Sequence, residues 1–162
     1  MSTTGIDYFR AWKSFLASDV GQELAPLLAD GTGHRFVLTL PHPELCTNKP
    51  PLTPGARMVR AKLTRDYRAQ AKRTARAVAT TPEDGAPQLR SASARLIFWF
   101  QDKRRRDIRN FEAGMKPAYD GLVDAGVIID DCSDVLTHAP TIFKIDGDCP
   151  RVEIIILNKA AA

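Results

Sequence analysis

Residues 91–106 read SASARLIFWFQDKRRR. From Ser91 to Phe100 apolar side chains stand at every second position, beginning with Ala92, which predicts a β-strand over residues 91–100 with one strongly apolar face. The strand is followed by a run of four cations, Lys103 to Arg106. The sequence therefore predicts a strand that is followed directly by a basic segment.

The start of the chain has the pattern of a helical arm. Residues 6–17 are predicted to form an amphipathic helix because apolar side chains recur at three- and four-residue spacing: Ile6, Phe9, Trp12, Phe15 and Leu16. A second helical stretch, residues 22–28, is interrupted by Pro26 and leads to a Gly-rich turn. We therefore predict an N-terminal arm, residues 1–33, and a main domain, residues 34–162. The apolar stripe is expected to pack on the body or on a partner subunit.

The main domain begins with a predicted strand, a loop and a basic helix. Residues 35–40 alternate and are rich in strand formers. Prolines make residues 41–54 a loop, because proline lacks a backbone donor. Apolar residues from Val59 to Val78 form a narrow seam on a helix whose other faces are cationic. From Arg57 to Arg76 the chain carries eight cations and one acid.

Beyond the cationic run, the pattern predicts one more helix and three short strands. Residues 111–126 have helical spacing, and Pro117 is expected to kink this helix or to start its second half. Residues 127–129 predict a short strand, and residues 142–145 and 151–157 predict a β-hairpin. The order of elements predicts an α+β fold, with a small mixed β-sheet and two main helices besides the arm.

The charge distribution limits the class of partner. The chain has a net charge of +4. Residues 1–30 hold two basic and four acidic side chains, a charge of −2, so the remainder carries +6. Such basic patches suit a polyphosphate, because neutralising phosphates releases counterions. The alternative is a solvated basic helix face without a ligand.

The cysteines and the apolar runs indicate the compartment. The three cysteines form no CxxC pair, and their odd number argues against a disulfide framework. The apolar runs, residues 154–157 among them, are too short to span a bilayer. We expect a cytoplasmic protein with reduced cysteines and no membrane partner.

Two acidic positions are candidate metal ligands. Asp107 follows the cationic run and precedes a helix, whereas Asp130 and Asp131 end a predicted strand. Nucleases use carboxylates from different elements to hold Mg²⁺, which polarises the scissile phosphate and lowers the pKa of the attacking water. The structural alternative is a helix cap at Asp107 and a turn at residues 130–131.

The runs RRRDIRN, residues 104–110, and KPAYDGLVDAGVIIDD, residues 116–131, closely resemble the signature of RusA-like Holliday-junction resolvases. In that family an Arg-rich strand end leads into Asp-x-Asp-Asn, a Lys, an Asp-x-Leu helix, Ala-Gly and Asp-Asp. The first strand, the Pro-rich loop, the Arg-rich helix and the C-terminal hairpin follow in family order. The resemblance covers roughly residues 35–158 and leaves the arm unmatched.

The resemblance implies a homodimeric, Mg²⁺-dependent endodeoxyribonuclease that resolves four-way DNA junctions in recombination and repair. Mn²⁺ is an expected substitute, and such small enzymes often belong to phages. Asp107, Lys116 and Asp131 are the implied catalytic residues, with Asp107 and Asp131 as metal ligands and Asp130 beside them. Lys116 is expected to stabilise the charge that develops on the phosphate. The resemblance and the charge pattern together name these candidate DNA contacts: Asn48, Arg68, Lys72, Lys103, Arg104, Arg105, Arg106, Arg109 and Asn110.

One position departs from the family. Arg109 stands where the second motif aspartate is expected, and a cation there removes a ligand and repels a metal ion. Glu112, one turn further along, is a candidate substitute carboxylate. Two functions therefore stay open: an active resolvase and a catalytically impaired junction-binding protein of the same fold. A basic RNA-binding domain is a third hypothesis. It is supported by charge alone, since no RNP-like aromatic pattern accompanies the charge.

Overall fold

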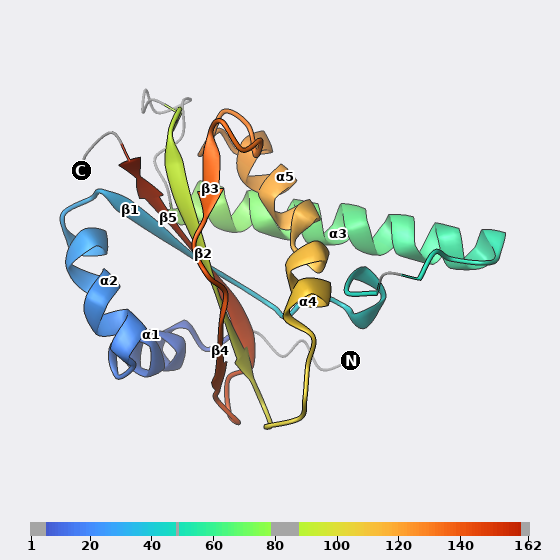
Figure 1. Ribbon diagram of the computed structural model, residues 1–162, viewed down its shortest axis with the longest axis horizontal. Helices are drawn as coiled ribbons and strands as arrows, with labels where there is room; N and C mark the ends of the chain where they lie inside the picture. Colours follow the sequence, from blue (N-terminus) through green and yellow to red (C-terminus); the bar gives the residue numbers. More distant parts are fainter. Residues whose placement is uncertain (1–5, 48, 79–87, 160–162) are drawn as a thin grey trace.

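The computed structural model describes residues 6–47, 49–78 and 88–159. Figure 1 shows a twisted sheet with helices on both faces. The helices are α1 (Tyr8–Leu16), α2 (Asp19–Ala29), the 3-10 helix η1 (Pro43–Leu45), α3 (Pro54–Val78), α4 (Ile108–Gly114) and α5 (Lys116–Asp124). The strands are β1 (Gly33–Leu38), β2 (Ala92–Phe100), β3 (Leu136–His138), β4 (Ile142–Ile145) and β5 (Arg151–Asn158).

The sheet is mixed, as the sequence predicts for an α+β fold. Its strand order is β1-β5-β2-β3, and β4 also pairs with β2. Strand β5 runs antiparallel to both β1 and β2, whereas β3 and β4 run parallel to β2. The predicted strand at residues 91–100 is therefore the element to which three other strands bond.

The predicted C-terminal hairpin is wrong. Strands β4 and β5 do not pair with each other, because each bonds to β2, on opposite edges of that strand. The reason lies in burial: all six residues from Arg151 to Ile156 are buried. A strand covered on both faces belongs in the interior of a sheet, and β5 takes that place between β1 and β2.

Other elements differ in part from the sequence prediction. Residues 127–129 form only an isolated bridge, Leu89 to Ile128, instead of a strand, and β3 has no counterpart among the predictions. Helix α2 continues through Pro26, which lies exposed on its outer face. The helix predicted over residues 111–126 is divided into α4 and α5 at Met115, with Pro117 in the first turn of α5. Pro117 therefore starts the second half, one of its two predicted effects.

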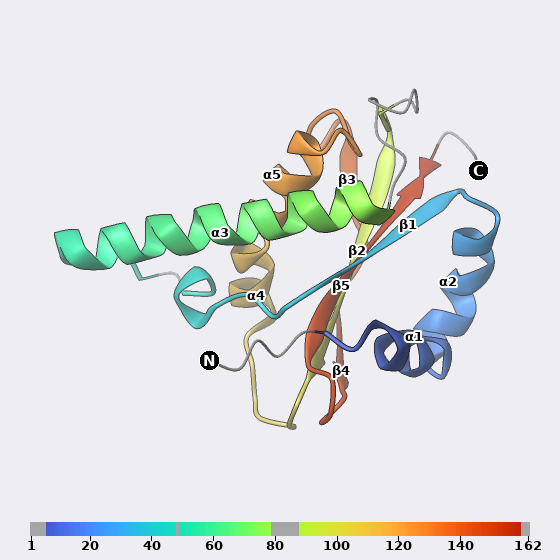
Figure 2. The ribbon, with the colours of Figure 1, turned by 180° about the vertical axis from the view of Figure 1, so that it is seen from behind.

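The sheet separates two packed layers, which Figures 1 and 2 show from opposite sides. On one face α3 and α5 cover the main core, whose members include Phe36, Phe98, Leu122 and Ile154. On the other face the arm packs on the sheet, where Phe15, Val20 and Leu24 meet Ile97, Trp99 and Ile155. Strand β2 thus contributes side chains to both layers, in keeping with its alternating pattern.

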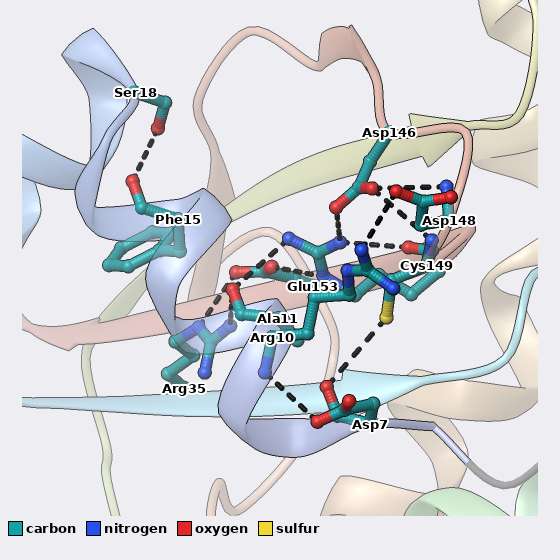
Figure 3. A network of polar contacts seen from close by, with 11 residues as sticks. Asp7, Arg10, Ala11, Phe15, Ser18, Arg35, Asp146, Asp148, Cys149 and Glu153 are labelled. Carbon is teal, nitrogen blue, oxygen red and sulfur yellow. Dashed lines mark hydrogen bonds and ion pairs between the residues drawn. The ribbon is translucent and has the colours of Figure 1, made fainter.

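Buried ion pairs fasten α1 to the sheet (Figure 3). The carbonyl oxygen of Ala11 accepts hydrogen bonds from Arg35 at 3.1 Å and from Arg151 at 3.2 Å. Both guanidinium groups also donate to Glu153, each at 2.7 Å. The pairing compensates for the burial of these charges, because each is hydrogen-bonded as well as neutralised.

The apolar stripe of the arm packs only in part as predicted. Phe15 is fully buried in the contact with the sheet, and Ile6 packs beside Ala11. Phe9 is 69% exposed and Trp12 is 38% exposed, so the outer side of the stripe faces solvent. The helical spacing correctly predicts the helix, but the face that is buried is narrower than the predicted apolar stripe.

Helix α3 is held by close contact with α5. A Cβ atom added at Gly121 would lie 2.5 Å from the carbonyl oxygen of Arg68, so only glycine permits this approach of the two helices. The N-terminal half of α3 extends beyond the sheet in Figure 1 and leaves Met58 and Val59 exposed. Across the described ranges, no helix is long and apolar enough to cross a membrane.

Candidate functional site

A pocket of about 560 Å³ lies between β2, α4, α5 and the end of β3. It forms where the start of α5 passes the edge of the sheet. Its lining residues combine carboxylates, a lysine, a histidine and a tyrosine with a few apolar side chains: Ala94, Leu96, Glu112, Lys116, Tyr119, Asp131, His138, Ala139 and Thr141. Convergent polar groups in a pocket of this size are typical of a ligand or active site.

Lys116, the first residue of α5, carries the positive charge of this pocket. Its Nζ atom donates to Asp120 Oδ1 at 2.9 Å and also to Asp131. The hydrogen bonds to Asp120 and to Asp131 raise the pKa of Lys116, because both partners favour the ammonium form. The structure therefore brings together two of the predicted catalytic residues, Lys116 and Asp131.

Tyr119 supplies an unsatisfied donor beside this ion pair. Its hydroxyl is buried and has no hydrogen-bond partner among the described residues. Burial raises the pKa of Tyr119 most, and the negative charges of Glu112 and Asp131 raise it further. The ring of His138 packs edge-on against Tyr119, with centroids 5.2 Å apart. The hydroxyl thus stays protonated near two carboxylates.

Glu112 faces the pocket, a direction that the sequence leaves undetermined. It lies in α4 and accepts a hydrogen bond from Thr141 Oγ1, just beyond β3. Glu112 and Asp131 are the two carboxylates among the lining residues. The preceding residue, Phe111, packs into the aromatic core. Because successive residues of a helix point in different directions, Glu112 lies on another face of α4.

Asp107 and Asp130 form the local structures that the alternative interpretation names. Asp107 caps α4, and its Oδ1 atom accepts from the backbone nitrogen of Arg109 at 3.0 Å. Asp130 Oδ1 accepts from the backbone nitrogen of Asp131 at 2.7 Å. Neither lines the pocket, and within residues 6–47, 49–78 and 88–159 no group of three or more His, Cys, Asp or Glu side chains is arranged to hold a metal ion.

The predicted DNA-contact residues comprise exposed cations, cations that interact within the protein, and two asparagines. Lys103, Arg105 and Arg109 are exposed, and no side-chain partner for them occurs in the described part of the chain. Arg104 is also exposed and lies 3.3 Å from Asp102. Lys103, Arg104 and Arg105 lie between β2 and α4, and Arg109 lies in the first turn of α4. The charges of Lys103, Arg105 and Arg109 are available to a phosphate.

The other predicted contacts are used within the protein. Arg106 binds Asp102 Oδ1 at 2.7 Å and lies over the Phe100 ring, 4.0 Å from its centroid. Arg68 makes a two-pronged pair with Asp124, at 2.6 and 2.7 Å. The hydrogen bonds from Arg68 lower the pKa of Asp124, and the charge of nearby Lys72 lowers it further.

The remaining two predicted contacts are asparagines. Asn110 is half-buried, and its side-chain oxygen is buried without a hydrogen-bond partner among the described residues. Asn48 lies outside the described residues. Sequence reasoning missed Tyr119, His138 and Thr141 as site residues. The one available signal was the spacing of Tyr119, three residues after Lys116 and therefore on the same side of a helix.

Comparisons with known proteins add no relative. A scan against protein-family models and a search of curated proteins found no match to this sequence. The RusA-like resemblance therefore rests on the motif residues themselves.

Proposed function

We propose that the protein is a metal-dependent, structure-selective endodeoxyribonuclease of the RusA type, which resolves four-way DNA junctions. The observation that carries the proposal is the pocket in which Lys116 and Asp131 meet, next to a segment of exposed cations. A lysine beside carboxylates suits hydrolysis of a phosphodiester, and exposed cations suit the approach of its backbone.

The residues of the pocket fit a Mg²⁺ or Mn²⁺ ion. Mg²⁺ commonly takes one or two carboxylates and completes its shell with water and substrate oxygens. Asp131 and Glu112 offer such a pair, and the buried Tyr119 hydroxyl is an unused donor beside them. Asp107, which caps α4, is not among the lining residues, so the ligand role that the resemblance implies for it is separate from this pair. When bound, the ion would polarise the phosphate and acidify the attacking water.

The protein's own groups have separate tasks in this proposal. Lys103, Arg105 and Arg109 hold the DNA backbone through phosphate contacts that do not depend on sequence. Lys116 offers its charge to the phosphate as negative charge develops in the transition state. The Tyr119 hydroxyl orients a carboxylate or a phosphate oxygen by donating a hydrogen bond.

A homodimer belongs to the same proposal. A four-way junction presents paired strands, and a two-fold symmetric dimer would place one site at each of two strands. Sedimentation velocity at micromolar concentration is expected to show a dimer. A monomer at that concentration would contradict this part of the proposal.

A second candidate function is a catalytically impaired junction-binding protein. Two observations favour it: Arg109 replaces the family aspartate, and Lys116 already neutralises Asp131. Restoring the family residue, Arg109→Asp, divides the two candidates. We expect this variant to cleave faster, or at lower Mg²⁺, if the natural protein is merely impaired. A loss of brisk wild-type cleavage would remove position 109 from the metal site.

The direct test uses a synthetic mobile four-way junction with labelled strands. Purified protein is incubated with the junction in Mg²⁺ and, separately, in EDTA. Paired nicks at symmetric positions in Mg²⁺ alone support the nuclease. Tight, junction-selective binding without nicks supports the binding protein, and equal affinity for junction and linear duplex contradicts both.

A further inference from the structure

A second pocket, of about 700 Å³, lies between the end of β1, η1, α3 and α4. It is adjacent to the first pocket, because Phe111 lines it while the next residue, Glu112, lines the first. Nothing in the proposed cleavage chemistry uses this second pocket. Arg106, at the end of the cationic run, is part of its wall.

The walls of the second pocket suit a flat ring. Three aromatic side chains, Tyr67, Phe100 and Phe111, line it. Phe100 and Phe111 pack edge to face with centroids 5.0 Å apart, and Arg106 covers Phe100. Tyr67 and Phe100 are buried, and Phe111 is the half-buried ring of the three. Aromatic surfaces are used by proteins to stack unpaired nucleobases.

The uncommitted polar groups of this pocket are hydrogen-bond donors. Gln70 Oε1 accepts from Thr39 Oγ1 at 2.9 Å, and no partner for the Gln70 amide nitrogen occurs in the described ranges. His42 Nδ1 accepts from a backbone nitrogen at 3.2 Å, so the proton of the neutral ring is on Nε2. Arg73 is exposed and has no partner among the described residues.

Two acceptors of the pocket are, by contrast, engaged within the protein. Asp66 Oδ2 pairs with Lys62, and the Thr39 carbonyl accepts from the Tyr67 hydroxyl at 2.9 Å. A flat ligand with an acceptor for Gln70 and an anionic group for Arg73 suits these groups. A nucleobase together with its phosphate has this chemistry.

We propose that the second pocket binds one unstacked DNA nucleobase, with the Gln70 amide donating to an acceptor on its edge and Arg73 holding its phosphate. The proposal rests on the proposed function in that the base comes from the branch point of a junction, where pairing is weakest. Every DNA base carries a carbonyl oxygen or a ring nitrogen that can accept this hydrogen bond. The pocket consequently holds a base at one position near the branch point without selecting among the four bases.

The first experiment tests the pocket without a junction. Deoxyguanosine monophosphate is titrated to millimolar concentration into ¹⁵N-labelled protein, and the side-chain NH₂ signal of Gln70 is followed. We expect that signal to shift with the nucleotide and to shift much less with inorganic phosphate. Equal shifts with nucleotide and inorganic phosphate, or shifts confined to exposed cations elsewhere, overturn the proposal.

The second experiment tests the pocket on DNA. Junction affinity is measured by anisotropy while abasic sites replace single nucleotides around the branch point. One abasic position is expected to weaken wild-type binding by about tenfold, the loss typical of one stacked base. Gln70→Glu and Arg73→Ala should remove that difference, and Gln70→Ala repeats the test without an added charge.

The matched control is Arg57→Ala, which removes an exposed cation from the same helix outside the pocket. It should weaken intact and abasic junctions equally, and melting curves verify that each variant folds. If junctions bind but no abasic position matters, the pocket proposal fails and the proposed function stands. If junctions do not bind at all, the proposed function fails, and the mononucleotide titration still decides whether the pocket takes a base.

Discussion

Neighbouring arginines in the cationic run differ in their surroundings, although they look alike in the sequence. Arg105 is exposed without a partner among the described residues, whereas the side chain of Arg106 is only 17% exposed and is bound to Asp102. Hydrogen bonds from Arg104 and Arg106 hold the pKa of Asp102 below its usual value. Arg105 is therefore available to a ligand, whereas Arg106 supports the fold.

This difference predicts opposite effects of two alanine substitutions. Arg105→Ala should weaken junction binding for all DNA sequences, lower the salt dependence of binding and leave the melting temperature unchanged. Arg106→Ala should reduce the free energy of unfolding by about 2 kcal/mol, because a charge-assisted hydrogen bond and a cation–π contact are lost. Denaturant titration and anisotropy measure both quantities. A base-specific loss in the Arg105 variant would contradict its assignment to phosphate.

The aspartates of the site permit an equally sharp comparison. Asp131→Asn should abolish cleavage while junction affinity stays equal or rises, because an anion near the phosphates is removed. Asp130→Asn is the matched control, since Asp130 is exposed and is not among the residues that line the pocket. Cleavage rates on a labelled junction measure the effect. Equal losses in both variants would contradict the assignment of Asp131 to the site.

Asp107 requires a variant that keeps its structural role. Asparagine caps helices as well as aspartate does, so Asp107→Asn should leave stability unchanged. If the carboxylate also serves the metal, as the resemblance implies, cleavage is lost in this stable variant. Full cleavage by Asp107→Asn would show that Asp107 is a cap only, with Asp131 and Glu112 as the remaining ligands.

At the scale of elements, the contact between α3 and α5 positions Lys116 relative to the sheet. Gly121→Ala forces a Cβ atom to within 2.5 Å of a backbone oxygen, so α5 must move. We expect a loss of about 2 kcal/mol in the free energy of unfolding, typical of overpacking. Gly55→Ala, at the start of α3, meets nothing within 4 Å and should be neutral or slightly stabilising. Denaturant titration of both variants tests the pair.

Elements with long, regular patterns agree with the sequence prediction; among the short ones, β4 occurs where it is predicted, whereas β3 was not predicted. The period-2 pattern of β2 and the narrow seam of α3 extend over several repeats, so each specifies a single structure. Gly126 follows the end of α5 with a φ of 78°, the left-handed conformation that glycine adopts readily after a helix. Strand β3 has three residues, two of them exposed, which is too short for a periodic signal.

At the scale of the whole molecule, the arm is part of the sheet's second core. Arg151 is fully buried and binds Glu153, Asp146 and two backbone carbonyls. Arg151→Met should therefore lower the free energy of unfolding by about 3 kcal/mol, because Glu153 and Asp146 lose a buried partner. The control is Arg10→Met, whose pair with Asp148 is exposed on both sides and should matter by less than about 1 kcal/mol. Similar losses in both variants would contradict the importance of burial here.

The sequence by itself determined the α+β class, the strand at residues 91–100, the basic helix and the Lys116 and Asp131 motif positions. These features depend on local periodicity and on residue types along a short stretch. The backbone geometry of a helix or strand determines directly which residues of such a stretch share a face. Tertiary structure alone decided that β4 and β5 take opposite edges of β2, and that Tyr119, His138 and Glu112 join Lys116 in one pocket. It also decided which cations form ion pairs within the protein. The reason is that strand partners, burial and ion pairs depend on which distant surfaces meet, and a one-dimensional pattern does not contain that information.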